Sequence, residues 1–345
     1  MTPQLNRRAM LGFSATATAT ALLAVSTGSA AAPPGGRPKA APVGTPAMIA
    51  AVYKLQTAKA QGTWSSYISV PGANAAAAPV VQERAENLVE AYSVNKIAVA
   101  TAVLDKVDRG QLRLDQRVEV AGDTVIPDGD GIFHLDGAYP SSVTLGHVLA
   151  ALLTVSDDTA VRLCGLVAPA KEINDIVRAK GFPKTQVKPV ANPNRFFLGQ
   201  TTPRETHDLL QKLVKGELLS PTSTSYLLKV LRSPIAFTDG IRRDMSTNER
   251  LRVATKAGWL DDGRNEAGII FDTAGKPAVT YSLFASGVFT GGEAVDANFA
   301  ATHPALQARA AMGRAFLDAV SDAPAPQMRL LKAAPQYRYR PRNGG

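Results

Sequence analysis

Three short segments of the chain carry residue types that together could perform nucleophilic catalysis. In chain order they are SVNK at 93–96, SDD at 156–158 and KAG at 256–258. A serine hydroxyl is a poor nucleophile until a neighbouring base takes its proton, and a lysine amine removed from water can be that base. Residues three positions apart on a helix share one face. We therefore predict Ser93 as the nucleophile and Lys96 as its base.

A change from strand to helix is expected at the first segment. The run 87–92 is strand-like and the run 97–107 is helix-like, which would place Ser93 where a helix begins. The backbone N–H of Ser93 would then lie at the positive end of the helix, where it can donate to a developing oxyanion. The alternative is an N-cap serine followed by an exposed lysine, and the two later segments favour catalysis over it.

The remaining pattern places strands at both ends of the sequence and helices in the middle. We expect strands at 62–70, 80–92, 118–120, 252–259, 266–272 and 278–287. We expect helices at 48–60, 143–154, 160–166, 171–179, 202–215, 222–231 and 304–320.

The three segments, in this order, resemble the S-x-x-K, S-D-N and K-T-G motifs of the serine β-lactamase and penicillin-binding family, and within it the class A β-lactamases. The resemblance covers about residues 47–321. It implies an α/β (α+β) fold of the β-lactamase/transpeptidase type. A mainly antiparallel sheet would be covered by the terminal helices, with an all-helical subdomain beside it.

The resemblance also implies a role for each matching residue. Ser156 would relay a proton to the leaving nitrogen beside Lys96 and Lys256. Gly258 matches the last position of the third motif. The backbone N–H of Trp259 would be the second oxyanion donor, so it is counted with the substrate-binding residues.

Asp158 departs from the motif because the family usually has Asn there. An amide can donate to a substrate carbonyl, whereas an ionised carboxylate only accepts. Asp158 could pair with Lys96 and hold that amine protonated, or it could favour a substrate that carries an amine. The sequence leaves both interpretations open.

Ala257 is a second departure, because it replaces a hydroxyl residue that helps to bind the substrate carboxylate in the family. One charge-assisted hydrogen bond is worth about 1.5–3 kcal/mol. Carboxylate binding would then depend on Lys256, with Arg264 as a candidate second contact. We interpret 264–266 rather as a hairpin turn with a surface ion pair.

The largest departure is an absence. Class A enzymes carry a Glu, on a loop after the second motif, that activates the water for hydrolysis of the acyl-enzyme. The corresponding stretch, 181–204, contains no Asp or Glu. General-base assistance is typically worth about 10²–10⁴-fold, so we expect deacylation to be slow unless Asp158 or Lys96 replaces the missing base.

Composition argues against several other classes of function. The net charge of +9 does not cluster with aromatic residues except in the tail, so we expect no nucleic-acid partner. The four histidines have no ligand spacing, and we expect neither a metal nor a cofactor. The single cysteine, Cys164, falls in an apolar run and is expected to be a buried, inert thiol.

The two ends of the chain are expected to lie outside the catalytic domain, 47–321. Residues 1–31 combine a basic start containing paired arginines, an apolar stretch and small residues, which is typical of an export signal of the twin-arginine type. Residues 32–46 form a Pro/Gly/Ala-rich linker and 322–345 a basic tail. No later stretch is long and apolar enough to span a bilayer.

The sequence therefore predicts an exported, monomeric serine hydrolase, secreted or held at the cell wall. It would act through an acyl-enzyme on a β-lactam or a related amide or ester carbonyl. The alternatives are a cell-wall peptidase or esterase of the same fold, and a non-catalytic protein that binds β-lactam or wall peptide.

Overall fold

The computed structural model describes residues 46–72, 76–291 and 301–321. The expected export signal, the linker except its last residue and the basic tail lie outside these residues. Within them, no helix is long and apolar enough to cross a membrane.

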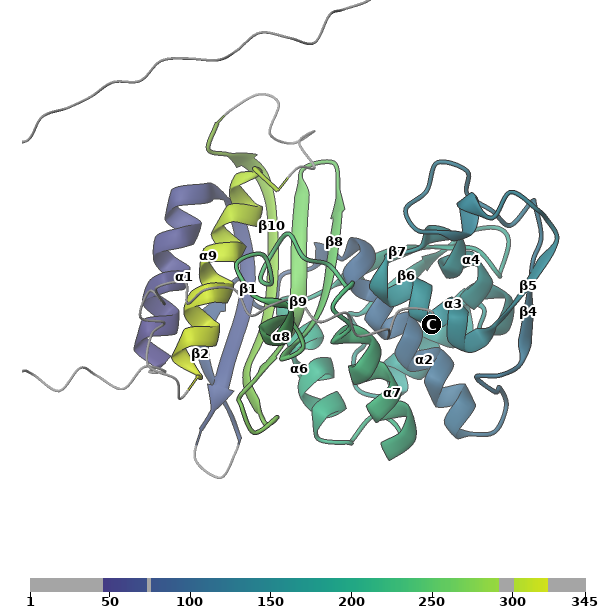
Figure 1. Ribbon diagram of the computed structural model, residues 1–345, viewed down its shortest axis with the longest axis horizontal. Helices are drawn as coiled ribbons and strands as arrows, with labels where there is room; N and C mark the ends of the chain where they lie inside the picture. Colours follow the sequence, from purple (N-terminus) through teal and green to yellow (C-terminus); the bar gives the residue numbers. More distant parts are fainter. Residues whose placement is uncertain (1–45, 73–75, 292–300, 322–345) are drawn as a thin grey trace, which may run out of the picture. The chain divides into compact units, whose positions relative to one another are not determined.

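Strands from the first and the last part of the described chain form one five-stranded antiparallel sheet (Figure 1). Its strand order is β2-β1-β10-β9-β8, so the first long strand pairs directly with the last. The strands are β1 (Gln61–Pro71), β2 (Ala77–Glu83), β8 (Val253–Leu260), β9 (Gly263–Phe271) and β10 (Pro277–Phe289). Strand β8 lies at one edge of this sheet.

Helices cover both faces of the sheet. Helix α1 (Pro46–Ala60) and helix α9 (Pro304–Ala319) lie side by side on one face (Figure 1), where Ile68 belongs to the apolar cluster that they share with the sheet. Helix α6 (Pro203–Val214) packs on the other face, where Ser69 bonds His207 of that helix. This agrees with the alternation of side chains along a strand.

The middle of the chain forms a helical subdomain around a second apolar cluster. Its helices are α2 (Lys96–Asp108), α3 (Leu145–Thr154), α4 (Asp158–Val167), α5 (Ala170–Ala179) and α7 (Pro221–Leu231). Leu104, Leu149 and Leu163 are fully buried in it, and burial of one such side chain contributes about 1.5–3 kcal/mol. Cys164 also lies in this cluster, as expected, and burial raises the pKa of its thiol to about 12.

The subdomain differs from the expectation in one respect, because it also holds two small sheets. Strands β4 (Arg117–Val120) and β5 (Ser141–Thr144) form one, and β3 (Val89–Glu90), β7 (Phe196–Thr201) and β6 (Gln186–Pro189) form the other. The strand expected at 80–92 is consequently divided between β2 and β3. It breaks at Arg84, whose φ of 45° is left-handed.

Helix starts follow the local signals in the sequence. Thr202 caps α6 by accepting a hydrogen bond from Glu205 N, and Pro203 occupies the first turn. Ser246 and Glu249 form a capping box around the short helix α8 (Thr247–Arg250). Both arrangements satisfy backbone N–H groups that a helix start leaves unpaired.

The expected hairpin turn at 264–266 is wrong. The turn lies at Asp261 and Asp262, while Arg264 and Glu266 are buried inside β9. The Glu266 carboxylate accepts from Thr255 Oγ1 at 2.7 Å and lies 3.5 Å from Arg309 Nε on α9. Pairing with these groups is what allows a charged residue to be buried at this position.

We expect Arg309→Met to lower the free energy of unfolding by about 3–5 kcal/mol, because it leaves the Glu266 carboxylate buried without its cation. Arg314→Met is the matched control on the same helix, since Arg314 pairs with Glu249 and Asp318 at the partly exposed surface. That change should cost about 1 kcal/mol or less. Urea denaturation measures both, and equal losses would contradict the argument.

Candidate active site

Ser93 lies in a 3₁₀ turn (η2, Tyr92–Asn95) that leads directly into α2. Tyr92 has a left-handed φ of 47°, which turns the chain sharply after β3. Asn95 Nδ2 donates to the carbonyls of Leu198 and Gln200 at 2.7 and 3.0 Å. The turn is therefore fastened to strand β7, and Ser93 itself is half-buried.

Lys96 is completely buried, and its amine points at the second segment. Lys96 Nζ donates to Ser156 O at 2.5 Å, to Ser156 Oγ at 3.1 Å and to Asp158 Oδ1 at 2.8 Å. Among the described residues, no hydrogen bond joins Ser93 Oγ to this amine. The pairing of Asp158 with Lys96, left open by the sequence, is thus present in the structure.

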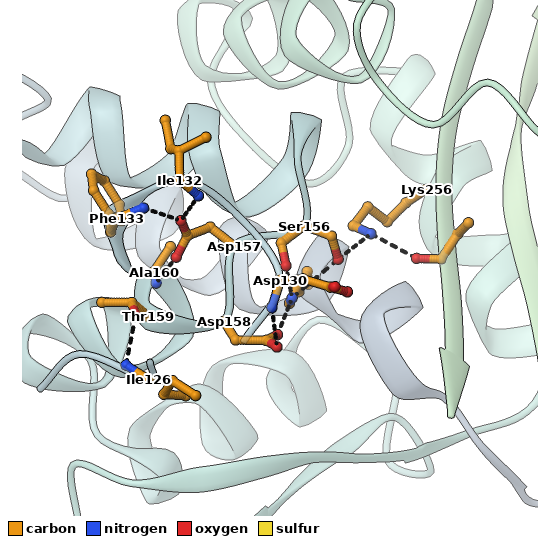
Figure 2. Close-up of polar contacts among 12 residues, drawn as sticks. Ile126, Asp130, Ile132, Phe133, Ser156, Asp157, Asp158, Thr159, Ala160 and Lys256 are labelled. Carbon is orange, nitrogen blue, oxygen red and sulfur yellow. Dashed lines mark hydrogen bonds and ion pairs between the residues drawn. The ribbon is translucent and has the colours of Figure 1, made fainter. Parts of the chain in front are cut away.

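Ser156 is in hydrogen-bond contact with two buried lysines, Lys96 and Lys256, the second of which is labelled beside it in Figure 2. Its Oγ is 3.1 Å from Lys96 Nζ and 3.0 Å from Lys256 Nζ, which also donates to Ala257 O at 2.6 Å. Ser156 has a φ of 57°, a left-handed conformation that is costly for a residue with a Cβ. The surrounding contacts therefore hold this hydroxyl where both amines reach it.

Burial governs the protonation of both lysines. Loss of hydration lowers the pKa of Lys96 below its ordinary value, and the charge and hydrogen bond of Asp158 oppose that fall. Burial holds the pKa of Lys256 well below its ordinary value, and the neighbouring Lys96 charge lowers it further. A low pKa suits a lysine that must accept a proton near neutral pH.

Asp157 fastens the loop 126–133 to the start of α4 (Figure 2). This buried carboxylate caps α4 by accepting from Ala160 N at 2.8 Å. It also accepts from Ile132 N at 2.7 Å and from Phe133 N at 2.9 Å. Phe133 itself is buried in the core of the subdomain.

The same loop brings a further acidic residue, Asp130, to the site. Asp130 N donates to Asp158 Oδ2 at 3.1 Å, and Asp158 N donates to Asp130 O at 3.0 Å. Partial burial and the Asp158 charge raise the pKa of Asp130, whereas the charges of Lys96 and Lys256 oppose the rise. The sequence does not predict Asp130 as a site residue, because it lies outside the three motifs and only the fold places its loop beside the second segment.

Gly258 explains how the third segment approaches the nucleophile. A Cβ at this position would lie 2.6 Å from Ser93 N and 2.7 Å from Val94 N. Strand β8 can therefore lie against the serine turn only if residue 258 has no side chain. The close approach places Ser93 N next to the β8 edge that carries Trp259.

A cavity of about 250 Å³ is lined by Ser156 and Lys256 of the site, whereas Ser93 and Lys96 are not among its lining residues. Asp130 also lines it, together with Ile235, Phe237, Asp239 and Trp259. The rings of Phe237 and Trp259 lie 5.1 Å apart. Trp259 is half-buried and lines the cavity, and its role in substrate binding stays a prediction.

The carboxylate-binding face of the third segment has changed. Ala257 is fully buried and is the cross-strand partner of Glu266. Arg264 does not line the cavity, and its Nη1 donates to the carbonyls of Asp261 and Gly263 at 2.7 and 2.8 Å. The candidate role of Arg264 in carboxylate binding therefore has no support here.

The stretch 181–204, which lacks acidic residues, passes beside the serine turn. It forms β6 and β7, and Ala91 N donates to Gly199 O at 2.8 Å. Glu205, the first acid after this stretch, accepts from Lys184 N at 3.0 Å and from Thr185 Oγ1 at 2.8 Å. Its hydrogen bonds are therefore made within the scaffold.

The structure brings the predicted residues of all three segments together. Lys96, Ser156, Asp158 and Lys256 share one hydrogen-bonded network, and Gly258 lies against Ser93 N. Their catalytic roles stay predictions. Within the described ranges, no group of three or more His, Cys, Asp or Glu side chains is placed to hold a metal ion.

A model of the β-lactamase enzyme family matches residues 48–320, which include the whole site. The chain belongs to the β-lactamase enzyme family. Its fold is of the class A β-lactamase type, as the resemblance implied. β-Lactamase VEB-1 of Pseudomonas aeruginosa is 22% identical over 192 residues, which span 52% of this chain and 64% of that protein. The match therefore covers less than two thirds of that relative.

Solved structures of this family share the fold of the present member. A β-lactamase from Sphaerobacter thermophilus has a TM-score of 0.65 at 22% identity and covers 79% of this chain and 96% of its own. PBP-A, solved as a mutant in an acyl-enzyme complex with penicillin G, has a TM-score of 0.61 at 19% identity. It covers 78% of this chain and 96% of its own.

Gly258→Ala should reduce the rate at which a fluorophosphonate labels Ser93 by about tenfold or more, because the new Cβ displaces Ser93 N. Gly122→Ala is the control, because a Cβ added at Gly122 would lie 3.8 Å from Tyr139 Cβ, which is ordinary van der Waals contact. Mass spectrometry of the labelled peptide measures both rates. An unchanged labelling rate in Gly258→Ala would contradict a role for the contact between residue 258 and Ser93 N in the reaction of Ser93.

Asp158→Asn should move the pH dependence of Ser93 labelling to lower pH. Asp158 raises the pKa of Lys96, so its loss lets that pKa fall further and leaves the amine neutral, and able to accept a proton, at lower pH. The labelling rate should rise with pH in both proteins, and earlier in the variant. The control is Asp123→Asn, at an exposed position, which should leave the pH dependence of labelling unchanged. A shift to higher pH in Asp158→Asn would contradict Lys96 as the base.

Proposed function

We propose that this member of the β-lactamase family is an exported serine hydrolase that forms an acyl-enzyme at Ser93 and releases it slowly. Its substrates would be β-lactams or related amides and esters. The observation that carries the proposal is the Ser156 hydroxyl held within 3.1 Å of two buried lysine amines. Such a network can move a proton from a nucleophile to a leaving group.

In the acylation step, Lys96 acts in its neutral form, which keeps two of the three hydrogen bonds that its ammonium donates. Ser93 Oγ attacks the carbonyl carbon and its proton passes to this amine. The N–H groups of Ser93 and Trp259 receive the negative charge that develops on the carbonyl oxygen. The bond to the leaving nitrogen or oxygen then breaks. The leaving atom takes a proton from Ser156 Oγ, and Ser156 is reprotonated by Lys96 along their 3.1 Å hydrogen bond.

The stretch 181–204 supplies no acidic side chain as a base for deacylation. The strand β7 beside the serine turn contributes Leu198, Gly199 and Gln200, and an amide cannot accept a proton near neutral pH. Asp158 is bonded to Lys96 and to Asp130 N, so its two carboxylate oxygens are already acceptors. We therefore expect the acyl-enzyme to persist.

A cell-wall peptidase or esterase of the same fold is the second candidate. Ala257 at the carboxylate-binding position and the lack of an acid in 181–204 favour it, because acylation of a peptide or ester requires neither. A protein that only binds β-lactam or wall peptide would not need the buried lysine network. Export by the segment 1–31 and a monomeric state are part of the proposal.

A time course of intact mass with benzylpenicillin, with free antibiotic followed in the same samples, tests the proposal. We expect a lasting adduct at Ser93, with little antibiotic consumed beyond one equivalent. Consumption of antibiotic without an adduct would contradict slow deacylation. If there is no adduct and no consumption, the result would favour the peptidase or esterase.

Two variants make the adduct specific. Ser93→Ala should abolish it. Ser69→Ala is the matched control, because Ser69 Oγ lies 2.7 Å from His207 Nε2 and is another serine that a neighbouring base could activate. An adduct that follows Ser69 and not Ser93 would overturn the assignment of the nucleophile.

A further inference from the structure

The exposed charges around the cavity are acidic. Asp130 and Asp239 are exposed and both line it, and the Asp158 side chain beside Asp130 is 36% exposed. Among the residues that the structure describes, Lys256 is the one basic residue in the cavity lining, and it is 3% exposed. A substrate entering the cavity therefore meets carboxylates first.

Asp130 is held in place while its carboxylate stays available. Its backbone N–H and carbonyl are both bonded to Asp158. Within the described part of the chain, the Asp130 carboxylate oxygens make no hydrogen bond or ion pair. Figure 2 shows Asp130 beside Ser156, so this carboxylate lies next to the predicted reaction centre.

The same cavity is poorly equipped for an anion. The residue at the carboxylate-binding position is Ala257, which offers no hydroxyl, and its cross-strand partner is Glu266. Residues paired across antiparallel strands have Cβ atoms about 4.5–5.5 Å apart. The buried Glu266 carboxylate is therefore a neighbour of the position where the motif's hydroxyl would bind an anion. Its own cation is Arg309 on helix α9.

We propose that this cavity selects acyl donors that carry a free ammonium group near the scissile carbonyl, and that Asp130 is the residue that recognises the ammonium. The inference rests on the proposed function, since it names the substrate class of that site. A substrate cation between Asp130 and Asp158 would relieve the repulsion of two neighbouring carboxylates, whereas an anion there would add to it. Asp239 would attract the same cation on entry.

Three penicillins test the charge at one position. Ampicillin carries an amino group and carbenicillin a carboxylate on the side-chain carbon where benzylpenicillin carries neither. Each is used to protect Ser93 from the fluorophosphonate. We expect ampicillin to protect at about tenfold lower concentration than carbenicillin, which corresponds to about 1.4 kcal/mol, with benzylpenicillin between them.

Variants then assign the preference to Asp130. Asp130→Asn should bring the three penicillins to within about twofold, and Asp130→Lys should reverse their order. Asp128→Asn is the matched control, because Asp128 is exposed on the same loop and does not line the cavity. It should leave the order unchanged. About 1 M salt should weaken the preference of the unmodified protein, since exposed charges are screened within about 3 Å.

Calorimetric titration of the Ser93→Ala variant with the same penicillins separates this inference from the proposed function. An affinity order led by ampicillin in this variant, together with no labelling of Ser93 by the phosphonate in the unmodified protein, would overturn the function and keep the recognition site. Equal affinities, binding of none of the three, or an order that survives Asp130→Asn would overturn the inference itself.

Discussion

Two lysine amines removed from water and directed at one serine hydroxyl set the main constraint on this structure. Each amine loses hydration, and the charge of Lys96 disfavours that of Lys256. The pair can be buried only because Ser156, Asp158 and the Ala257 carbonyl accept hydrogen bonds from them. The left-handed backbone of Ser156 and the glycine at 258 both follow from bringing three distant segments to that point.

The sequence predicts much of this arrangement because the relevant signals are local. The three motifs sit at the ends of well-marked helices and strands, and the helices were found within a few residues of their observed bounds. The main sheet and its covering helices were likewise expected. A family resemblance then joined the motifs, which spacing alone could not have done.

The missed features depend on contacts between distant residues. Strands β6 and β7 are short. Strand β7 is held partly by hydrogen bonds from the Asn95 side chain, and Asn95 is a variable position of the S-x-x-K motif, so the sequence gives it no role. Glu266 looks like a surface residue because charged side chains usually are, and its buried partners come from β8 and α9. Asp130 joins the site only because Asp157 fastens its loop.

The Asp157 carboxylate fixes one part of the cavity lining. It bonds the loop that carries Asp130 to the first turn of α4, directly after Ser156. The lining also includes Ile235, which is 69% exposed. A different side chain at 235 would therefore change which acyl groups fit without disturbing the hydrogen bonds that join Ser156 to the two lysines.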